Sequence, residues 1–362
     1  MSNKVYISST KVIAPGISEN ESISNSLYNG QLENLMEYEE IGQGQKAQFA
    51  HLSVSKENPL YPNRSDLKVM RNDVLGLTVC LRSLCQELSL TDEDLKTIPL
   101  QIANGASIDH LSDQLEKLAP ILSDLKNIED RTEKNKKIFK TIPPLLALRT
   151  LTNAAQSFAS QYTQIRGGGT TFGVTSLGGF YALKEAYEAI KNGEIGCAIV
   201  ASSHLAGPHS YLSNSYFNDG SVEWRESSTA VCLFLESEES LKQNKRKALA
   251  EILDLKQIPK TPTLKRQAKK FDKNILDPAL NCHIYGGAQT FSNFENDAKA
   301  IQELNPNAFS FFPYWGNTGP SSLLLSLALA CEQLAHSNKS IQCTDYDSFA
   351  RNFSVSLNSK IQ

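Results

Sequence analysis

One local design occurs twice in this chain, in its middle and again near its end. Each copy is a short strand, a glycine-rich turn and a helix with one apolar face. In the first copy, residues 170–176 run into Leu177-Gly178-Gly179 and then into a helix over 180–193. In the second, residues 308–312 precede Gly316-Asn317-Thr318-Gly319, and a helix follows over 323–334. Two copies of a strand–turn–helix unit predict an internally duplicated α/β fold.

The flanking segments support that interpretation. Residues 197–201 and 231–235 are unbroken apolar runs, which are typical of strands covered by helices on both faces. The first helix ends at Gly193, where a left-handed cap belongs. Further strands and helices are expected at 5–13 and 72–90.

The length of the chain sets its division into parts. It has 362 residues, whereas one hydrophobic core comfortably serves roughly 150. We therefore expect two halves, an N-terminal half over 1–238 and a C-terminal half over 239–362.

Composition excludes several classes of function. Lys and Arg total 36 and Asp and Glu 39, so the net charge of −3 gives no electrostatic case for a nucleic-acid partner. The seven cysteines show no CxxC spacing, which argues against a disulfide framework or a zinc site. The glycines at 167–169 lack the Gly-Lys-Ser/Thr of a phosphate loop. No apolar run approaches the ~18–20 residues of a membrane span, and no secretory leader opens the sequence. We expect no metal, no cofactor, no membrane span and a reducing cytoplasm.

Several segments share an order with one known family. Residues 5–9 and Ala14-Pro15-Gly16 look like its first strand and turn, and Arg71-Asn72-Asp73 looks like its Arg-x-Asp helix. Asn153 and the stretch 228–236 match later landmarks. In this order, the segments resemble the β-ketoacyl synthases of the thiolase fold, particularly the elongating type of fatty-acid and polyketide synthesis. The resemblance implies duplicated βαβ-rich halves in a layered αβαβα arrangement.

The chain departs from that family at the positions that carry chemistry. The resemblance puts Ser176 where the family has its nucleophilic cysteine, Gly286 and Asn317 where it has two histidines, and Phe312 where it has a lysine. A serine hydroxyl needs an adjacent base, and neither glycine nor asparagine can shuttle protons. We therefore expect no catalytic residue. Phe312 and its aromatic neighbours either pack the core or fill the space that an active enzyme leaves open.

The resemblance then implies a non-catalytic role. Such a subunit, a chain length factor, pairs with an active ketosynthase and shapes the acyl tunnel, which sets chain length in type II polyketide, polyene or fatty-acid-like synthesis. Tunnel or interface candidates are Ile121, Leu145 and Leu146. The second expected partner is an acyl carrier protein, which is acidic, so basic residues could steer its docking. These docking candidates are Lys265, Arg266, Lys269 and Lys270.

Two other classes of protein stay open. In the first, the chain is an acyltransferase or hydrolase that uses Ser176 as nucleophile, with His204 or His283 as the base. In the second, it is a homodimeric, non-enzymatic module that binds an acyl group or a carrier. An acyl adduct on Ser176 would indicate the first, and stable self-association without a synthase partner the second.

Overall fold

The computed structural model describes most of the chain. Its described residues are 3–32, 35–42, 45–105, 124–126, 128–141, 151, 153–173, 176–207, 224–258, 273–277, 280, 282–286, 291–335, 337, 339–346 and 351–359.

Five strands form the N-terminal part of a large mixed sheet. They are β1 (Val5–Ile13), β4 (Leu100–Asn104), β5 (Thr171–Phe172), β6 (Cys197–His204) and β8 (Thr229–Ser237). In space they lie in the order β1-β8-β6-β4-β5. The first two pairings are antiparallel and the next two are parallel.

Five later strands repeat this pattern. They are β9 (Ala250–Ile258), β10 (Cys282–Tyr285), β11 (Phe309–Ser310), β12 (Ser340–Tyr346) and β13 (Asn352–Asn358). Their order β9-β13-β12-β10-β11 again has two antiparallel pairings followed by two parallel ones. A short antiparallel contact between β1 and β9 joins the two parts into one ten-stranded sheet of the described residues. The predicted duplication is confirmed.

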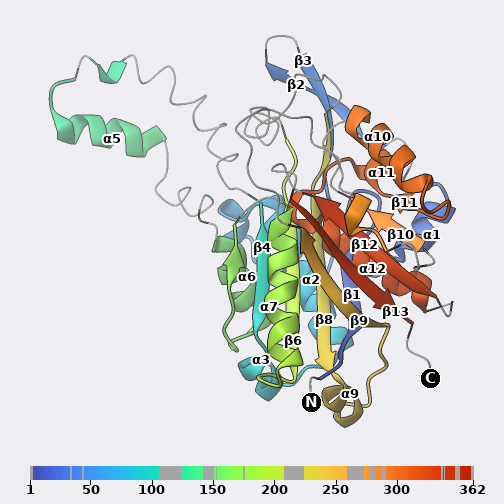
Figure 1. Cartoon of the computed structure of the whole chain (residues 1–362). Helices are drawn as coiled ribbons and strands as arrows, with labels where there is room; N and C mark the ends of the chain where they lie inside the picture. The colour runs from blue at the N-terminus through green and yellow to red at the C-terminus, as the bar shows by residue number, and fades with distance from the viewer. Residues whose placement is uncertain are drawn as a thin grey trace.

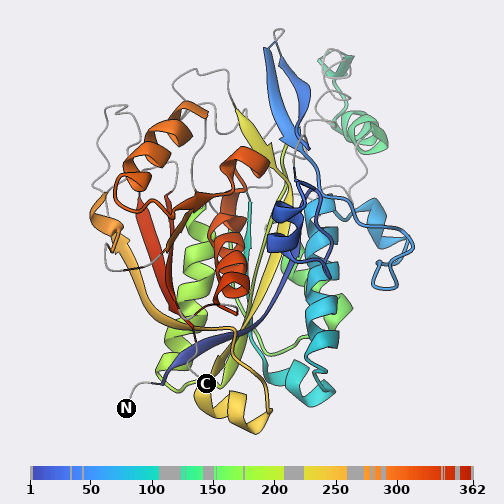
Figure 2. The ribbon, with the colours of Figure 1, turned by 90° about the vertical axis from the view of Figure 1, so that its right-hand side faces the viewer.

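The helices form layers around this sheet. The central helices α7 (Leu177–Lys191) and α12 (Ser322–Leu334) contact each other and share one apolar cluster with residues of both strand series. Two helices, α2 (Asn72–Glu87) and α6 (Ala154–Thr163), pack in a second apolar cluster with β4, β6 and β8. Figure 1 shows α7 and α6 beside β4 and β6, and Figure 2 shows α12 and α2 on opposite sides of the N-terminal strands. This is the layered thiolase-like arrangement.

Shorter elements complete the description. A three-stranded sheet pairs β2 (Glu37–Gly42), β3 (Gln45–Ala50) and β7 (Arg225–Ser227). The remaining helices are α1 (Ile23–Tyr28), α3 (Asp92–Thr97), α5 (Arg131–Thr141), α9 (Glu238–Gln243), α10 (Phe291–Gln302) and α11 (Phe312–Trp315), with short 3-10 turns η1 (Asp66–Lys68), η4 (Lys273–Ile275) and η5 (Gly319–Ser321). The proposed division of the chain at 238/239 falls at the first residue of α9.

The observed elements refine the sequence predictions. The expected helix over 72–90 is α2, and Gly193 adopts the predicted left-handed conformation after α7, with a φ of 77°. The predicted strand over 308–312 is wrong at its end, because only Phe309–Ser310 pairs and Phe312 begins α11. The physical reason is Pro313, which cannot donate to a ladder but is compatible with the first turn of a helix.

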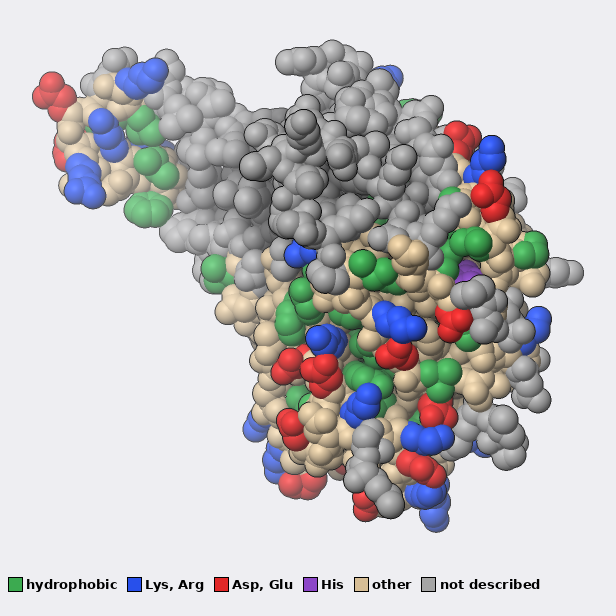
Figure 3. Space-filling view, viewed as in Figure 1, with side chains coloured by type: hydrophobic (Ala, Val, Ile, Leu, Met, Phe, Trp, Pro, Cys, Tyr) green, Lys and Arg blue, Asp and Glu red, His purple; other side chains and the backbone are tan. Residues whose placement is uncertain are grey.

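Charges are mixed on the surface. Figure 3 shows acidic and basic side chains interspersed over the described part of one face. Among the described residues, none of the helices combines the length and apolar character that a membrane crossing requires.

Candidate functional site

Ser176 lies at the turn that precedes α7. The residue is 8% exposed, and its hydroxyl donates to the main-chain carbonyl of Tyr346 over 3.1 Å. Tyr346 is the last residue of β12, so this bond joins the start of a central helix to the end of a strand from the other half. The hydroxyl proton is thus directed at a main-chain acceptor, which cannot act as a general base.

The start of α7 is pressed against the turn η5. A Cβ on Gly179 would lie 2.3 Å from the carbonyl oxygen of Pro320, and one on Gly178 would lie 3.7 Å from the Pro320 Cβ. Only glycine permits this approach of two backbones. The contact brings the segment that contains Asn317 next to the turn of Ser176.

Asn317 forms hydrogen bonds within its own turn and with β7. Its side-chain oxygen accepts from the main-chain N–H of Gly319 over 2.9 Å. Its own main-chain N–H donates to the carbonyl of Arg225 over 2.8 Å. The carbonyl of Asn317 in turn accepts from the amide of Ser227 over 3.0 Å. These bonds fix the turn to β7, and they use the amide side chain for local structure.

Gly286 directly follows β10 and faces the start of α12. A Cβ at this position would lie 2.0 Å from the hydroxyl oxygen of Ser322 and 3.5 Å from a carboxylate oxygen of Asp345. Both Ser322 and Asp345 are buried. Any side chain at residue 286 therefore requires the Ser322 hydroxyl to leave its position.

Phe312 lies in a buried aromatic group. It is 2% exposed, and its amide donates to the hydroxyl of Ser310 over 3.2 Å. The neighbouring rings of Phe311 and Trp315 stack at 5.0 Å, and the Trp315 indole donates to the carbonyl of Pro15. Phe311 and Trp315 belong to the central apolar cluster, so the aromatic group packs the core.

His204 forms a buried pair that the sequence did not reveal. Its Nε2 donates to a carboxylate oxygen of Glu226 over 2.7 Å, and both side chains are buried. The Trp224 indole lies 3.4 Å from the other oxygen of Glu226. The imidazole also occupies the direction in which a Cβ on Gly319 would point, with Nδ1 only 2.5 Å away. The pair supports the same turn that contains Asn317.

A second buried network surrounds Asp73 and includes Ser203, the residue before His204 on β6. Arg71 holds Asp73 through two bonds of 2.9 and 2.6 Å. Asn104 and Ser203 also donate to the Asp73 carboxylate, over 3.1 and 3.0 Å. All four residues are buried. Because the partners come from α2, β4 and β6, the network fixes the strand ends beneath the turn.

His283, the other candidate base, lies inside the C-terminal strands. Its Nε2 donates to the side-chain oxygen of Gln342 on β12 over 2.9 Å, and the residue is 1% exposed. Burial lowers the pKa of His283 from its ordinary value, and the bond to Gln342 opposes that change. The Nε2 atoms of His204 and His283 are thus hydrogen-bonded to Glu226 and Gln342.

The cysteines are all free thiols. Burial raises the pKa of Cys85 to about 12 and that of Cys197 to about 11. Burial also raises the pKa of Cys232, Cys331 and Cys343. These thiols are held in the protonated state, which is a poor nucleophile.

Some predicted residues lie outside the described part of the chain. These are the tunnel candidates Ile121, Leu145 and Leu146 and the docking candidates Lys265, Arg266, Lys269 and Lys270. Within the described part, no three His, Cys, Asp or Glu side chains gather as a metal ion would require.

Comparisons with known proteins agree with this architecture. No family model and no curated protein matches the chain. Solved structures do match over its whole length. The ishigamide ketosynthase/chain length factor has a TM-score of 0.74 at 14% identity and covers 100% of both chains. A β-ketoacyl synthase from Burkholderia phymatum STM815 has a TM-score of 0.74 at 12% identity, covering 99% of this chain and 100% of its own.

A third match is a structure of a complex. It contains a type II polyketide synthase acyl carrier protein with its ketosynthase bound to the hexaketide, and it has a TM-score of 0.71 at 16% identity over 99% of both chains. At these identities the likeness establishes the fold. The chain has the thiolase-like fold of the β-ketoacyl synthases and of their chain length factor partners.

Proposed function

We propose that the chain is a ketosynthase-like subunit that does not itself condense acyl chains. It pairs with an active β-ketoacyl synthase, which supplies the nucleophilic cysteine, and it forms one wall of the acyl tunnel. Its products belong to type II polyketide, polyene or fatty-acid-like synthesis, and it works in the cytoplasm with an acyl carrier protein.

The observation that carries the proposal is the geometry at residue 286. Condensation in this fold needs hydrogen-bond donors aimed at a developing enolate oxygen. Such donors stabilise the transition state by several kcal/mol. Gly286 offers no side-chain donor, and the Ser322 hydroxyl lies 2.0 Å from the place of its Cβ. The surroundings of Gly286 are thus packed for a glycine.

The bonds of Ser176 and Asn317 support the same conclusion. The Ser176 hydroxyl donates to a carbonyl, and the Asn317 amide oxygen accepts from its own turn. An acyltransferase or hydrolase would need a base beside Ser176. The Ser176 hydroxyl instead donates to the main-chain carbonyl of Tyr346, so this geometry favours the non-catalytic role over the serine enzyme.

The role in chain length remains part of the proposal. Bulky side chains at Ile121, Leu145 and Leu146 would limit how far a growing chain extends. Lys265, Arg266, Lys269 and Lys270 would attract an acidic carrier protein toward the tunnel mouth.

Co-expression tests the proposal. The chain is produced alone and together with an intact ketosynthase and carrier protein, and each product is analysed for size and for acyl adducts by mass spectrometry. We expect a heterodimer whose acyl group is on the partner's cysteine. Ser176→Ala should leave product formation unchanged, as should Ser157→Ala on the exposed face of α6.

Two results would contradict the proposal. An acyl adduct on Ser176 that disappears in Ser176→Ala but survives in Ser157→Ala would make the chain an enzyme. A stable homodimer that ignores the synthase would make it a separate acyl- or carrier-binding module.

A further inference from the structure

The helix α5 stands apart from the layered body of the molecule. Figure 1 shows it well away from the sheet and from the helices that cover the sheet. Of residues 131–140, all are exposed except Lys134 and Ile138, which are half-buried, and Phe139 is 57% exposed. Isolated helices shorter than about 12–15 residues are only marginally stable in water, and α5 has 11 residues. We therefore expect a binding partner to stabilise it.

The charges of α5 are distributed unevenly along its axis. Asp130 caps the first turn, because its carboxylate accepts from the main-chain N–H of Thr132 over 2.8 Å. Within the helix the one acidic side chain is Glu133. From Lys134 to Thr141 the sequence has four lysines and no acidic residue. The last two turns of α5 therefore attract anions.

The helix is also amphipathic. Successive residues are 100° apart around a helix, so Ile138 and Phe139 share one side with Asn135. Lys136 and Lys140, four residues apart, lie together on the opposite side. Figure 3 shows both basic and hydrophobic side chains on the surface of α5. Basic amphipathic helices are typical of segments that lie on a membrane surface.

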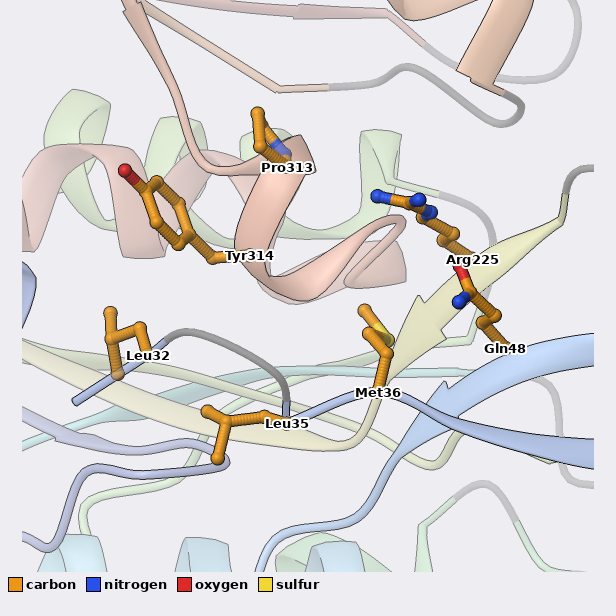
Figure 4. Close-up of a pocket in the computed structure, with 7 residues that line it drawn as sticks. All are labelled: Leu32, Leu35, Met36, Gln48, Arg225, Pro313 and Tyr314. Carbon is orange, nitrogen blue, oxygen red and sulfur yellow. The ribbon is translucent and has the colours of Figure 1, made fainter. Parts of the chain in front are cut away.

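A lipid surface matches both sides of α5 at once. When a helix lies in the plane of the interface, its apolar side chains enter the boundary with the acyl chains and its lysines extend to the headgroups. An acidic globular protein on the lysine side would leave Phe139 exposed on the other side. A small-molecule site lies elsewhere, because none of the seven residues that line the 320 Å³ cavity in Figure 4 belongs to α5.

We propose that α5 binds the surface of an anionic lipid bilayer. Lys136 and Lys140 contact the phosphates of the headgroups, and Ile138 and Phe139 enter the boundary between the headgroups and the acyl chains. This contact would also supply the partner that an isolated helix of this length needs. The inference goes beyond the proposed function and does not depend on it.

Co-sedimentation of the full chain with lipid vesicles tests the proposal. The probes are vesicles of equal parts phosphatidylglycerol and phosphatidylcholine, and vesicles of phosphatidylcholine alone. We expect binding to the anionic vesicles only. Raising the salt from about 0.1 M to 1 M should release the chain, because the Debye length falls from about 10 Å to 3 Å. No synthase is present, so this test can fail while the proposed function stands, and the reverse.

Three variants of α5 make the test specific. Lys136→Gln and Lys140→Gln should each weaken binding about fivefold, because a lysine near an anionic surface contributes about 1 kcal/mol. Phe139→Ala should weaken binding about tenfold or more, because burial of a Phe side chain contributes about 1.5–3 kcal/mol. A fourth variant, Phe139→Trp, should bind with a shift of its tryptophan emission to shorter wavelengths.

The matched control is Lys242→Gln. Lys242 is an exposed lysine of α9, and its loss should leave vesicle binding unchanged. Circular dichroism verifies that each variant is folded. The proposal is overturned if the chain binds anionic vesicles no better than neutral ones, or if the emission of Phe139→Trp does not shift. It is also overturned if Lys136→Gln and Lys140→Gln weaken binding no more than the control does.

One further outcome separates a lipid surface from a protein. The same variants are titrated with an acidic carrier protein. A chain that ignores the vesicles but binds this protein through Lys136 and Lys140 would show that α5 docks a protein, and the proposal would be wrong.

Discussion

The two halves of the sheet contain buried polar centres of different character. In the N-terminal half the centre is charged, because the Asp73 carboxylate accepts from Arg71, Asn104 and Ser203. It joins α2 to the ends of β4 and β6. A buried carboxylate is tolerated only when it is paired and hydrogen-bonded in this way.

In the C-terminal half the centre is neutral. Gln342 of β12 accepts from His283 of β10, and its amide nitrogen donates to the Ile275 carbonyl and the Ser354 hydroxyl. It also accepts from the amide of Asp277. The same topology is thus fixed by an ion pair in one half and by an amide in the other. The comparison teaches that the duplicated backbone does not require equivalent polar chemistry.

The strand ends of the two halves show a shared device. Gly105 follows β4 and faces the imidazole of His204, which lies 2.9 Å from the place of its Cβ. Gly286 follows the equivalent strand β10 and faces Ser322 and Asp345. Each glycine admits a polar side chain from another element. The packing at residue 286 therefore has a counterpart at Gly105 in the N-terminal half.

The largest expected loss in the free energy of unfolding comes from a substitution that breaks the charged centre. Arg71→Leu leaves the Asp73 carboxylate buried without its cation, and loss of one partner from a buried pair costs about 3–5 kcal/mol. Gln342→Leu leaves neutral groups unsatisfied, which costs about 1–3 kcal/mol. Urea unfolding of both variants measures the two free energies of unfolding.

An exposed pair provides the control for this prediction. Lys96→Ala removes the surface pair with Glu93, and such pairs contribute at most about 1 kcal/mol. Equal losses in Arg71→Leu and Gln342→Leu would show that the two centres do not differ as argued.

The two glycines at the candidate site sharpen the comparison further. An alanine at residue 179 would place its Cβ 2.3 Å from the Pro320 carbonyl, which is backbone and cannot rotate away. Among the described residues, the one atom closer than 3.4 Å to an alanine Cβ at residue 286 is the Ser322 hydroxyl oxygen at 2.0 Å, and that hydroxyl can adopt another rotamer. We expect Gly179→Ala to cost about 1–3 kcal/mol, as overpacking does, and Gly286→Ala to cost less.

Two further variants make that prediction specific. Ser322→Ala should remove most of the cost of Gly286→Ala in a double-mutant cycle. Gly196→Ala, whose Cβ would have its nearest neighbour at 3.9 Å, should be nearly neutral. A Gly286→Ala loss that persists in the Ser322→Ala background would mean that another group occupies the space.

Local patterns in the sequence predicted the duplicated fold. The apolar face of α7 and the cap at Gly193 depend on neighbouring residues, and so does the unbroken run of β6. The strand–turn–helix order then limits the topology, because crossovers between parallel strands follow one hand. This is why the elements were recovered even though no family model matches the chain.

The polar centres could not be predicted in the same way. Asp73 meets Asn104 and Ser203 only after α2 packs on β4 and β6, and nothing in the sequence around Glu226 marks a buried partner for His204. A usable signal existed for Phe312, because Pro313 directly after it favours the first turn of a helix over a strand.

The smallest expected effect concerns the neutral centre and pH. Burial lowers the pKa of His283 below its usual 6.5. The imidazole therefore binds a proton more readily in the unfolded chain than in the folded chain. The stability that the neutral imidazole contributes is therefore full above about pH 6.5 and is lost as the pH falls toward the depressed pKa. Each unit of depression corresponds to about 1.4 kcal/mol.

His283→Asn isolates this contribution, because an asparagine can still donate to Gln342 but does not titrate. Urea unfolding between about pH 7.5 and 5.5 spans the usual titration range of histidine. The difference in free energy of unfolding between wild type and His283→Asn should shrink as the pH falls through this range. A difference that stays constant would show that His283 has the same pKa in the folded and unfolded chains. A difference that grows as the pH falls would show that the imidazole is protonated in the folded chain, and the C-terminal centre would then be charged like its N-terminal counterpart.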